Sequence, residues 1–533
     1  MTDAADPNAR WTRFRALSLH DRDLGFSVDT SAMMWSRADF DALVPALEAA
    51  RNEMAALEGG AIANVDEDRM VGHYWLRDAR LAPTAELKTC IEEARRATEK
   101  LAAGIRAGTV APAGGGRFRT AVVVGIGGSS LGPMLVCDAL EGVPSASSPS
   151  GDAPAGDPLA LRFFDNTDPD GFDRLRRDLD LATTLTIVIS KSGGTKETRN
   201  GMLEMKAAYE AAGLAFGPHA VAVTSAGSTL DETARAEGFI ARLPMYDWIG
   251  GRTSVTSPVG LLPAALAGVD IAAFLDGAAA MDVATRKEPA QNPAAWLAAS
   301  WFHARGKAMV MLPYKDRLAL ISRYLQQLVM ESLGKARNRQ GDEVHAGIAV
   351  YGNKGSTDQH AYVQQLLDGP NDFFVTFIHI ARAREGASIE VEPGVTSGDY
   401  LFGFLRGTRE ALSGRGRGSI TLTLPVVDAR RVGALVALYE RAVGFYASLV
   451  DVNAYHQPGV ESGKKAAARV IALQASVRAV LDATPCDAET VAARAGTDDV
   501  EAVAAVLAHL VANGAAREED PAAAPWDQRF ATA

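Results

Sequence analysis

The sequence predicts a doubly wound α/β protein, because short apolar runs alternate with helical stretches along most of its length. The runs are continuous and rich in β-branched residues, which is typical of parallel strands that are buried on both faces. They are bounded by Gly, Ser or Asp, residue types that end strands. With 533 residues, 47% of them hydrophobic, the chain is long enough to bury a large core.

The elements are expected in four parts. Residues 1–115 read as a helical region, rich in Ala, Leu, Glu and Arg, that ends near a glycine-rich stretch. Residues 116–280 are expected to form a first α/β domain, with strands at 121–127, 160–166, 184–190, 219–225 and 239–245. Residues 281–482 are expected to form a second α/β domain, with strands at 308–314, 347–351, 372–380 and 419–427.

The second domain is expected to close with a long helix that starts near Lys464. One face of this helix would carry Val470, Leu473, Val477, Val480 and Leu481. Residues 483–533 read as a helix-turn-helix or winged-helix-like appendage with a tail. Residues 471–520 hold three arginines against nine acids, so this appendage is interpreted as a packing or interaction element rather than a DNA reader. A chain ending near Asp482 keeps Lys464 and its helix, so it is expected to retain any activity that the two α/β domains carry.

Composition excludes several classes of function. Lys and Arg total 54 against 65 Asp and Glu, and the net charge of −11 argues against a general nucleic-acid or membrane-surface binder. Three scattered cysteines are too few for a disulfide framework or a four-ligand zinc site. No apolar signal region is visible near the N-terminus, and the apolar window 258–275 is interrupted by Pro263, Gly268 and Asp270. A cytoplasmic protein is the expectation.

Two glycine-rich turns are candidate ligand loops. Gly125 to Pro133 follows a predicted strand and contains Gly128 and Ser129, but it lacks the spacing of a dinucleotide-binding loop, and a tight turn is the alternative interpretation. The second turn combines hydroxyls, a lysine and two glycines between a strand and a helix, which favours a phosphate cradle over a plain N-cap turn. Its polar residues are Ser190, Lys191, Ser192 and Thr195.

Four further features carry ionisable or polar groups. Arg252 follows Gly251 and suits an oxyanion or phosphate, although a surface arginine is the simpler reading. Gln327 and Glu331 lie four residues apart on one helical face, where Glu331 is either a general base or a partner of Lys335 in a salt bridge. Spacing alone does not join these residues to the three remaining polar candidates, which are His360, Gln457 and Lys464.

Together, six segments resemble the phosphoglucose isomerase family, whose members are built from two sugar-isomerase (SIS) domains. The segments are VGIGGSSLGP, ISKSGGTKET, GGRTSVTSPVG, QQLVMESLGK, STDQHAYVQQL and HQPGVESGK, in the family's order over residues 121–465. Three departures are visible. Thr253 and Thr256 replace common aromatics, MESLGK replaces MESNGK, and GSTDQHA replaces GTNGQHA. They put the shape of the sugar pocket in doubt.

The resemblance implies two SIS-type α/β/α sandwiches and reversible isomerisation of glucose 6-phosphate to fructose 6-phosphate, in glycolysis and gluconeogenesis. Ring opening and a cis-enediolate would carry the reaction, with neither cofactor nor metal. A homodimer is implied, in which His360 enters the neighbouring subunit's site. The alternatives are a dual glucose and mannose 6-phosphate isomerase, and a non-catalytic SIS sensor of sugar phosphates.

Roles for single residues also come from the resemblance. Ser190, Lys191, Ser192 and Thr195 would hold the phosphate; Ser129 would line the pocket, Gly128 would allow close approach, and Gly251 belongs to the substrate site. Glu331 would carry the proton between C2 and C1 while Arg252 stabilises the enediolate. His360, oriented by Glu197, would open the ring with help from Lys464. Gln327 and Gln457 would hydrogen-bond the sugar or a water molecule.

Overall fold

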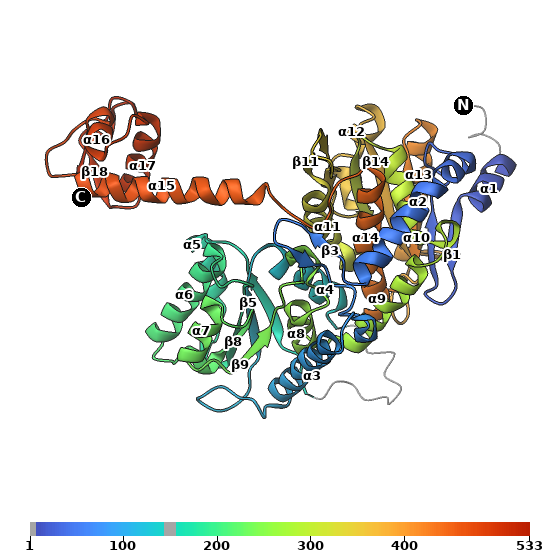
Figure 1. Ribbon diagram of the computed structural model, residues 1–533, viewed down its shortest axis with the longest axis horizontal. Helices are drawn as coiled ribbons and strands as arrows, with labels where there is room; N and C mark the ends of the chain where they lie inside the picture. Colours follow the sequence, from blue (N-terminus) through green and yellow to red (C-terminus); the bar gives the residue numbers. More distant parts are fainter. Residues whose placement is uncertain (1–6, 143–155) are drawn as a thin grey trace. The chain divides into compact units, whose positions relative to one another are not determined.

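The computed structural model describes residues 7–142 and 156–533. It contains two mainly parallel β-sheets flanked by helices, which confirms the predicted α/β class (Figure 1). The chain divides into two compact units, Met1–His456 and Gln457–Ala533, and both of these sheets belong to the first unit. The domain limits expected at residues 115, 280 and 482 stay predictions.

The first sheet has five parallel strands in the order β6-β5-β7-β8-β9. All five were expected, and they span Ala160–Phe164 (β6), Thr120–Val124 (β5), Thr184–Ile189 (β7), Ala220–Thr224 (β8) and Ala241–Pro244 (β9). Three helices pack on each face. The first set is α3 (Ala85–Ala107), α4 (Leu131–Leu140) and α8 (Pro258–Leu266), and the second is α5 (Pro169–Arg177), α6 (Lys196–Ala211) and α7 (Thr229–Ala236).

Alternate residues of the central strands supply these two cores. Val123 and Ile187 belong to the large core on the α3, α4 and α8 side, whereas Val122 and Val188 pack with α5, α6 and α7. Successive side chains of a strand point to opposite faces, so a strand covered on both faces must be apolar throughout. This is why these strands appear in the sequence as continuous apolar runs.

The second sheet has the order β1-β2-β17-β14-β10-β13. Its parallel part was expected and consists of β10 (Ala308–Pro313), β13 (Val350–Tyr351), β14 (Phe373–Ile380) and β17 (Ser419–Leu424). The N-terminal region, expected to be helical, adds the antiparallel strands β1 (Ser18–Asp21) and β2 (Phe26–Asp29) at one edge. Of these four-residue strands, β2 pairs with β17, a long-range contact that local sequence does not encode, and β1 pairs with β2.

Long helices pack around the second sheet. They are α2 (Arg37–Glu58), α9 (Ile271–Thr285), α10 (Pro293–His303), α13 (Ser397–Gly414) and α14 (Ala429–Leu449), with α1 (Pro7–Ala16) and the short α11 (Ile321–Leu325) and α12 (Val363–Asp368). Among the described residues, α14 is the one helix long and apolar enough to cross a membrane, but 89% of its apolar window is buried. It is therefore a core helix of the protein.

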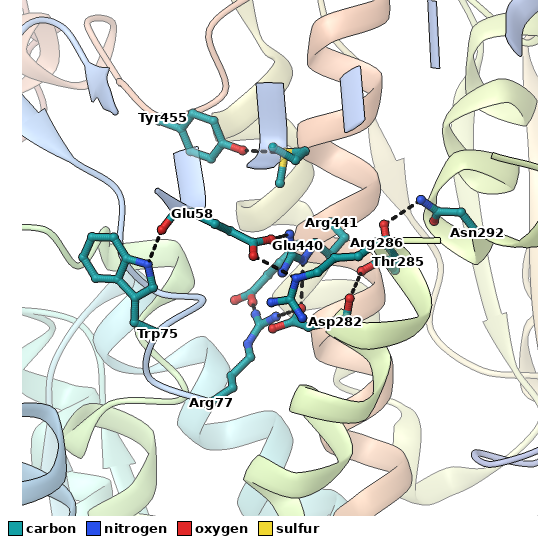
Figure 2. A network of polar contacts seen from close by, with 11 residues as sticks. Glu58, Trp75, Arg77, Asp282, Thr285, Arg286, Asn292, Glu440, Arg441 and Tyr455 are labelled. Carbon is teal, nitrogen blue, oxygen red and sulfur yellow. Dashed lines mark hydrogen bonds and ion pairs between the residues drawn. The ribbon is translucent and has the colours of Figure 1, made fainter. Parts of the chain in front are cut away.

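A buried ionic cluster ties the N-terminal segment to α9 and α14 (Figure 2). Asp282 accepts from Arg77 Nη1 at 2.6 Å and from Arg441 Nε at 2.8 Å. Arg77 also pairs with Glu440, and Arg441 with Glu58 at the end of α2. Buried charges are tolerated only when each is paired, so removal of one partner exposes the desolvation cost of the others.

The second unit has a core of its own. It contains α15 (Val460–Val480), α16 (Ala488–Ala495), α17 (Val500–Ala512) and the hairpin β18 (Ala516–Glu518)–β19 (Phe530–Thr532). Val477 of α15 is fully buried with Val491 and Leu507, whereas Val470, expected on the same face, is 51% exposed. The apolar face of α15 that packs in this unit is thus shorter than the sequence pattern predicts.

Candidate active site

The two candidate ligand loops follow neighbouring strands. The first sheet has the 2-1-3-4-5 order of a flavodoxin-like fold, in which ligands bind at the carboxyl ends of the two strands where the order reverses. These strands are β5 and β7. The 3₁₀ turn η2 (Gly127–Ser129) follows β5, and residues 190–195 join β7 to α6. The topology therefore places both loops at the point of the sheet where an open α/β fold binds its ligand.

The loop after β7 is shaped by its own hydroxyls. The backbone N–H of Gly193 donates to Ser190 Oγ and that of Gly194 to Ser192 Oγ, both at 3.1 Å. Gly193 has φ +71°, and a Cβ there would lie 2.3 Å from the Leu230 nitrogen, so only glycine fits. The loop ends at Thr195, the N-cap of the 16-residue helix α6, whose N-terminus favours an anion.

Lys191 connects this loop to the segment before Gly251. Its Nζ donates to the carbonyls of Asp247 at 2.7 Å and Ile249 at 3.2 Å. Burial, together with the positive charge of Arg69, lowers the pKa of Lys191. The bound ammonium therefore holds the loop after β7 and the segment before Gly251 together.

The glycines of the two other loops are in direct backbone contact. A Cβ on Gly128 would lie 1.9 Å from the carbonyl oxygen of Gly251, and Ser254 Oγ donates to the Gly128 carbonyl at 3.4 Å. Gly127, with φ +59°, faces the amide of Gln327, whose Nε2 would be 2.9 Å from an added Cβ. Three segments far apart in sequence therefore meet here.

Arg252 is held rigidly in η5 (Gly251–Thr253) and is only 7% exposed. Its Nε donates to Ser332 Oγ at 2.7 Å, and its Nη2 donates to the carbonyls of Ala454 at 2.5 Å and His456 at 3.3 Å. Its Nη1 lies 3.6 Å from Glu331 Oε2. Burial lowers the pKa of Arg252 although Glu331 raises it. The simpler reading of a surface arginine is therefore wrong.

Glu331 ends a π-helix, Gln326–Glu331, that continues α11. The sequence predicted one regular helix here; the wider π-turn differs from it, and such turns often occur at functional sites. Gln327 Nε2 donates to Glu331 Oε1 at 3.4 Å, so the predicted pair shares a face. Lys335 Nζ donates instead to the carbonyls of Glu331 and Ser332, at 2.6 and 2.9 Å. The alternative salt bridge between the Lys335 and Glu331 side chains is thus not formed.

Several residues near Arg252 and Glu331 were not identified from the sequence. Asp66, in the turn between β3 (Ile62–Asn64) and β4 (Arg69–Met70), has Oδ2 2.9 Å from His456 Nδ1. Burial lowers the pKa of His456, while Asp66 opposes this change. Ser332 adjoins Glu331 in the sequence and was within reach of motif analysis. The carbonyls that bind Arg252 carry no sequence signal, because every residue has one.

His360 and Glu197, two of the predicted ring-opening residues, come from separate segments of the first unit. His360 is exposed at the end of the 3₁₀ turn η9 (Thr357–His360), and the buried Asp358 of this turn accepts hydrogen bonds from the backbone N–H groups of Asn353 at 2.8 Å and Lys354 at 3.1 Å. Within the described parts of the chain, no hydrogen bond or ion pair joins His360 to Glu197, Arg252 or Glu331. Helix α12, directly after His360, lies well apart from α6, which carries Glu197 (Figure 1).

Gln457 and Lys464 belong to the second unit, Gln457–Ala533. Lys464 lies in α15, but its side chain is outside the described residues. Their predicted contacts with the substrate stay predictions. Among the described residues, no group of three His, Cys, Asp or Glu side chains is arranged to hold a metal ion.

Two mainly parallel sheets, a glycine- and hydroxyl-rich loop at the switch point and a carboxylate beside a buried arginine define an α/β protein with a candidate site for a small anionic ligand. Comparison with known proteins refines this class. The sequence profile of the family "Phosphoglucose isomerase" matches residues 37–397 and 408–490. The chain belongs to the phosphoglucose isomerase family.

Individual relatives agree with this assignment. The chain is 55% identical over 515 residues to the "Glucose-6-phosphate isomerase" of Geobacter sp. (strain M21), with 95% of each chain covered. It is 54% identical over 518 residues to that of Nostoc punctiforme, covering 95% of this chain and 96% of the relative. The crystal structure of a glucose-6-phosphate isomerase from Chlamydia trachomatis superposes with a TM-score of 0.78 at 28% identity, covering 89% of this chain and 93% of that one.

Proposed function

We propose that the site formed by the glycine loops, Arg252 and Glu331 is where this chain interconverts glucose 6-phosphate and fructose 6-phosphate. The activity follows from membership of the phosphoglucose isomerase family and from identity above 50% over nearly the whole chain to glucose-6-phosphate isomerases. The chain is thus an aldose–ketose isomerase. The observation that carries the assignment of the site is the Glu331 carboxylate 3.6 Å from a buried, immobilised guanidinium.

The chemistry requires this combination. An aldose and its ketose differ by a proton moved from C2 to C1 and a second proton moved between the two oxygens. One carboxylate above both carbons takes and returns the carbon-bound proton, a contribution of about 10² to 10⁴ in rate. The enediolate formed between the two transfers needs fixed positive charge, which Arg252 supplies without reorganisation because its other donors are already engaged.

The loop from Ser190 to Thr195 is proposed to bind the phosphate. Its hydroxyls and the N-terminus of α6 present donors at one turn, and Gly128 and Ser129 lie on the loop of the adjacent strand. A remote phosphate held in this way orients the short open-chain sugar over Glu331. Gln327, which donates to Glu331, is proposed to share its amide with a sugar hydroxyl or water.

His360, Glu197 and Lys464 are proposed to act on the ring, and His360 from the second subunit of a homodimer. His360 is exposed, and its turn is tied to α13 through Gln359 Nε2, which donates to the Phe404 carbonyl at 3.3 Å. The same region exposes a group of large apolar side chains, namely Ile389, Val391, Tyr400, Phe402 and Phe404. Exposed apolar side chains of this kind are covered in stable assemblies. A second copy that covers it would receive His360.

The first experiment tests the carbon base. Glu331→Gln keeps the side-chain shape and removes the base, so isomerisation should fall by at least about 10³ while a sugar-phosphate inhibitor still binds. The measurements are turnover in chelator and exchange of solvent deuterium into C2 of glucose 6-phosphate. Glu343→Gln, on the exposed strand β12 (Glu343–Ala346), is the matched control and should remain active. Wild-type deuterium exchange in Glu331→Gln would refute the role of Glu331.

The second experiment tests the shared site. Glu331→Gln and His360→Ala homodimers should each be inactive. Hybrid dimers should regain activity, since one of their two sites combines an intact Glu331 with an intact His360. Sedimentation and differently tagged subunits establish that hybrids have formed. If such hybrids stay inactive, His360 does not enter the neighbouring site.

The alternative substrate and the cellular location are also open to measurement. Thr253 and Thr256 are buried beside Arg252, where the family commonly has aromatics, so the pocket is proposed to differ in its selection at C2. Rates on glucose 6-phosphate and mannose 6-phosphate, measured side by side, test for dual activity. The family is one of soluble glycolytic enzymes, and we propose a cytoplasmic location, which cell fractionation would check.

A further inference from the structure

Lys335 occupies an unusual position beside the site. It begins β11 (Lys335–Arg337), which pairs with β12 through Lys335 and Ala346, and it is only 5% exposed. Lysine is among the residues least often buried without a partner. Its ammonium donates to the carbonyls of Glu331 at 2.6 Å and Ser332 at 2.9 Å.

These two carbonyls are at the end of the π-helix. The last carbonyls of any helix lack partners within the helix and must be satisfied from outside. The chain turns into β11 directly after them, and a Cβ on Gly334 would lie 2.7 Å from the Met330 carbonyl oxygen, which shows how tight this turn is. Lys335, anchored in a strand pair, therefore closes the end of the helix that presents Glu331.

The same two residues hold Arg252. Glu331 Oε2 lies 3.6 Å from Arg252 Nη1, and Ser332 Oγ accepts from Arg252 Nε at 2.7 Å. A shift of this helix end would move the carboxylate and loosen the guanidinium together. Displacement of about 1 Å in a reacting group can cost about 10² in rate.

We propose that Lys335 is a positioning residue of the isomerisation, whose ammonium holds the end of the π-helix so that Glu331 and Arg252 keep their reactive arrangement. This inference rests on the proposed function of Glu331 and Arg252. Lys335 touches neither substrate nor reacting atom; it acts through the backbone of the residues that do.

The charge on Lys335 depends on pH within a range that can be assayed. Arg252 on η5 faces it as a like charge, Glu331 on the π-helix and Asp66 on the β3–β4 turn face it as opposite charges, and His456 lies in the same cluster. Burial and Arg252 together lower the pKa of Lys335 to about 8. Above that pH the amine still has two N–H groups, but its bonds to the carbonyls lose their charge assistance.

Stability and activity should then respond to pH in opposite directions. The folded-state pKa lies below the ordinary value of 10.5, so the unfolded chain binds more protons between about pH 8 and 10.5. The contribution of Lys335 to the free energy of unfolding therefore rises with pH over this window. The kcat should fall over the same window, which a merely structural role of Lys335 does not predict.

The test compares kcat and KM from pH 6 to 10 for the wild type, Lys335→Met and Lys335→Arg, with Lys88→Met on the exposed face of α3 as control. Lys335→Met should lower kcat by about 10² at pH 7, change KM by less than about threefold, and remove the kcat step near pH 8. Lys335→Arg should restore much of the kcat and move the step to higher pH, because guanidinium stays charged.

A folded Lys335→Met enzyme with kcat within threefold of the wild type would overturn the proposal. An unchanged step near pH 8 in that variant would do the same, and this readout stands even if the arginine does not fit. Glu331→Gln is assayed in parallel. If it is inactive while Lys335→Met is fully active, the positioning role fails and the proposed function stands; if folded Glu331→Gln is active, the proposed function itself fails.

Discussion

Gly128→Ala is the substitution whose effect is most directly set by the structure. An added Cβ would lie 1.9 Å from the carbonyl oxygen of Gly251, and ordinary contact begins near 3.4 Å. The two backbones must therefore separate by about 1.5 Å, because neither contact atom belongs to a flexible side chain. Gly251 precedes Arg252, so the guanidinium moves with it. A displacement of 1 Å or more predicts a loss of about 10² in kcat/KM.

The assay is coupled turnover of fructose 6-phosphate, with circular dichroism and thermal unfolding to confirm the fold. Gly407→Ala is the matched control, since Gly407 lies in α13 and an added Cβ meets nothing within 4 Å. Alanine is also the better helix former, so this control should be as stable as the wild type or more so. A folded Gly128→Ala enzyme within threefold of wild-type kcat/KM would refute the close approach of the two loops.

Two further predictions concern stability. Asp282→Asn leaves Arg77 and Arg441 without their shared carboxylate, so it should lower the free energy of unfolding of the first unit by about 3 to 5 kcal/mol in urea. The control Asp276→Asn, at an exposed position on the same helix, should change this free energy little, and equal stability of the two variants would contradict the role of the buried cluster. The expectation that a chain ending near Asp482 keeps its turnover stays a prediction, but the structure gives a reason to expect the opposite, because Val477 of α15 is buried by residues beyond 482. Isolated helices are marginal in water, so α15 should lose helicity in the truncated protein. Because Lys464 lies in α15 and is proposed to act on the ring, activity should fall as well. Wild-type turnover of the truncated protein would show that α15 does not need the second unit's core.

The sequence by itself determined the α/β class and most of the parallel strands. Strands such as the one predicted at residues 184–190 can be recognised from the sequence, because burial on both faces requires apolar residues at every position, and this is a local property of the chain. The turn from Ser190 to Thr195 could also be predicted, since glycines and hydroxyls are typical of a strand-to-helix turn, and its role in binding phosphate stays a prediction. The order of the motifs along the chain was sufficient to indicate the family.

Only the tertiary structure decided how these parts meet. Strand β2 is held by pairing with β17, and β1 by pairing with β2. The π-helix that ends at Glu331 is a small change in hydrogen-bond register that no residue pattern predicts. Lys335 is the clearest case. Its spacing from Glu331 suits a side-chain salt bridge, yet the helix ends between them and the ammonium reaches backbone carbonyls instead. Sequence spacing specifies which residues are near one another along an element, whereas partners across elements depend on backbone atoms that every residue shares.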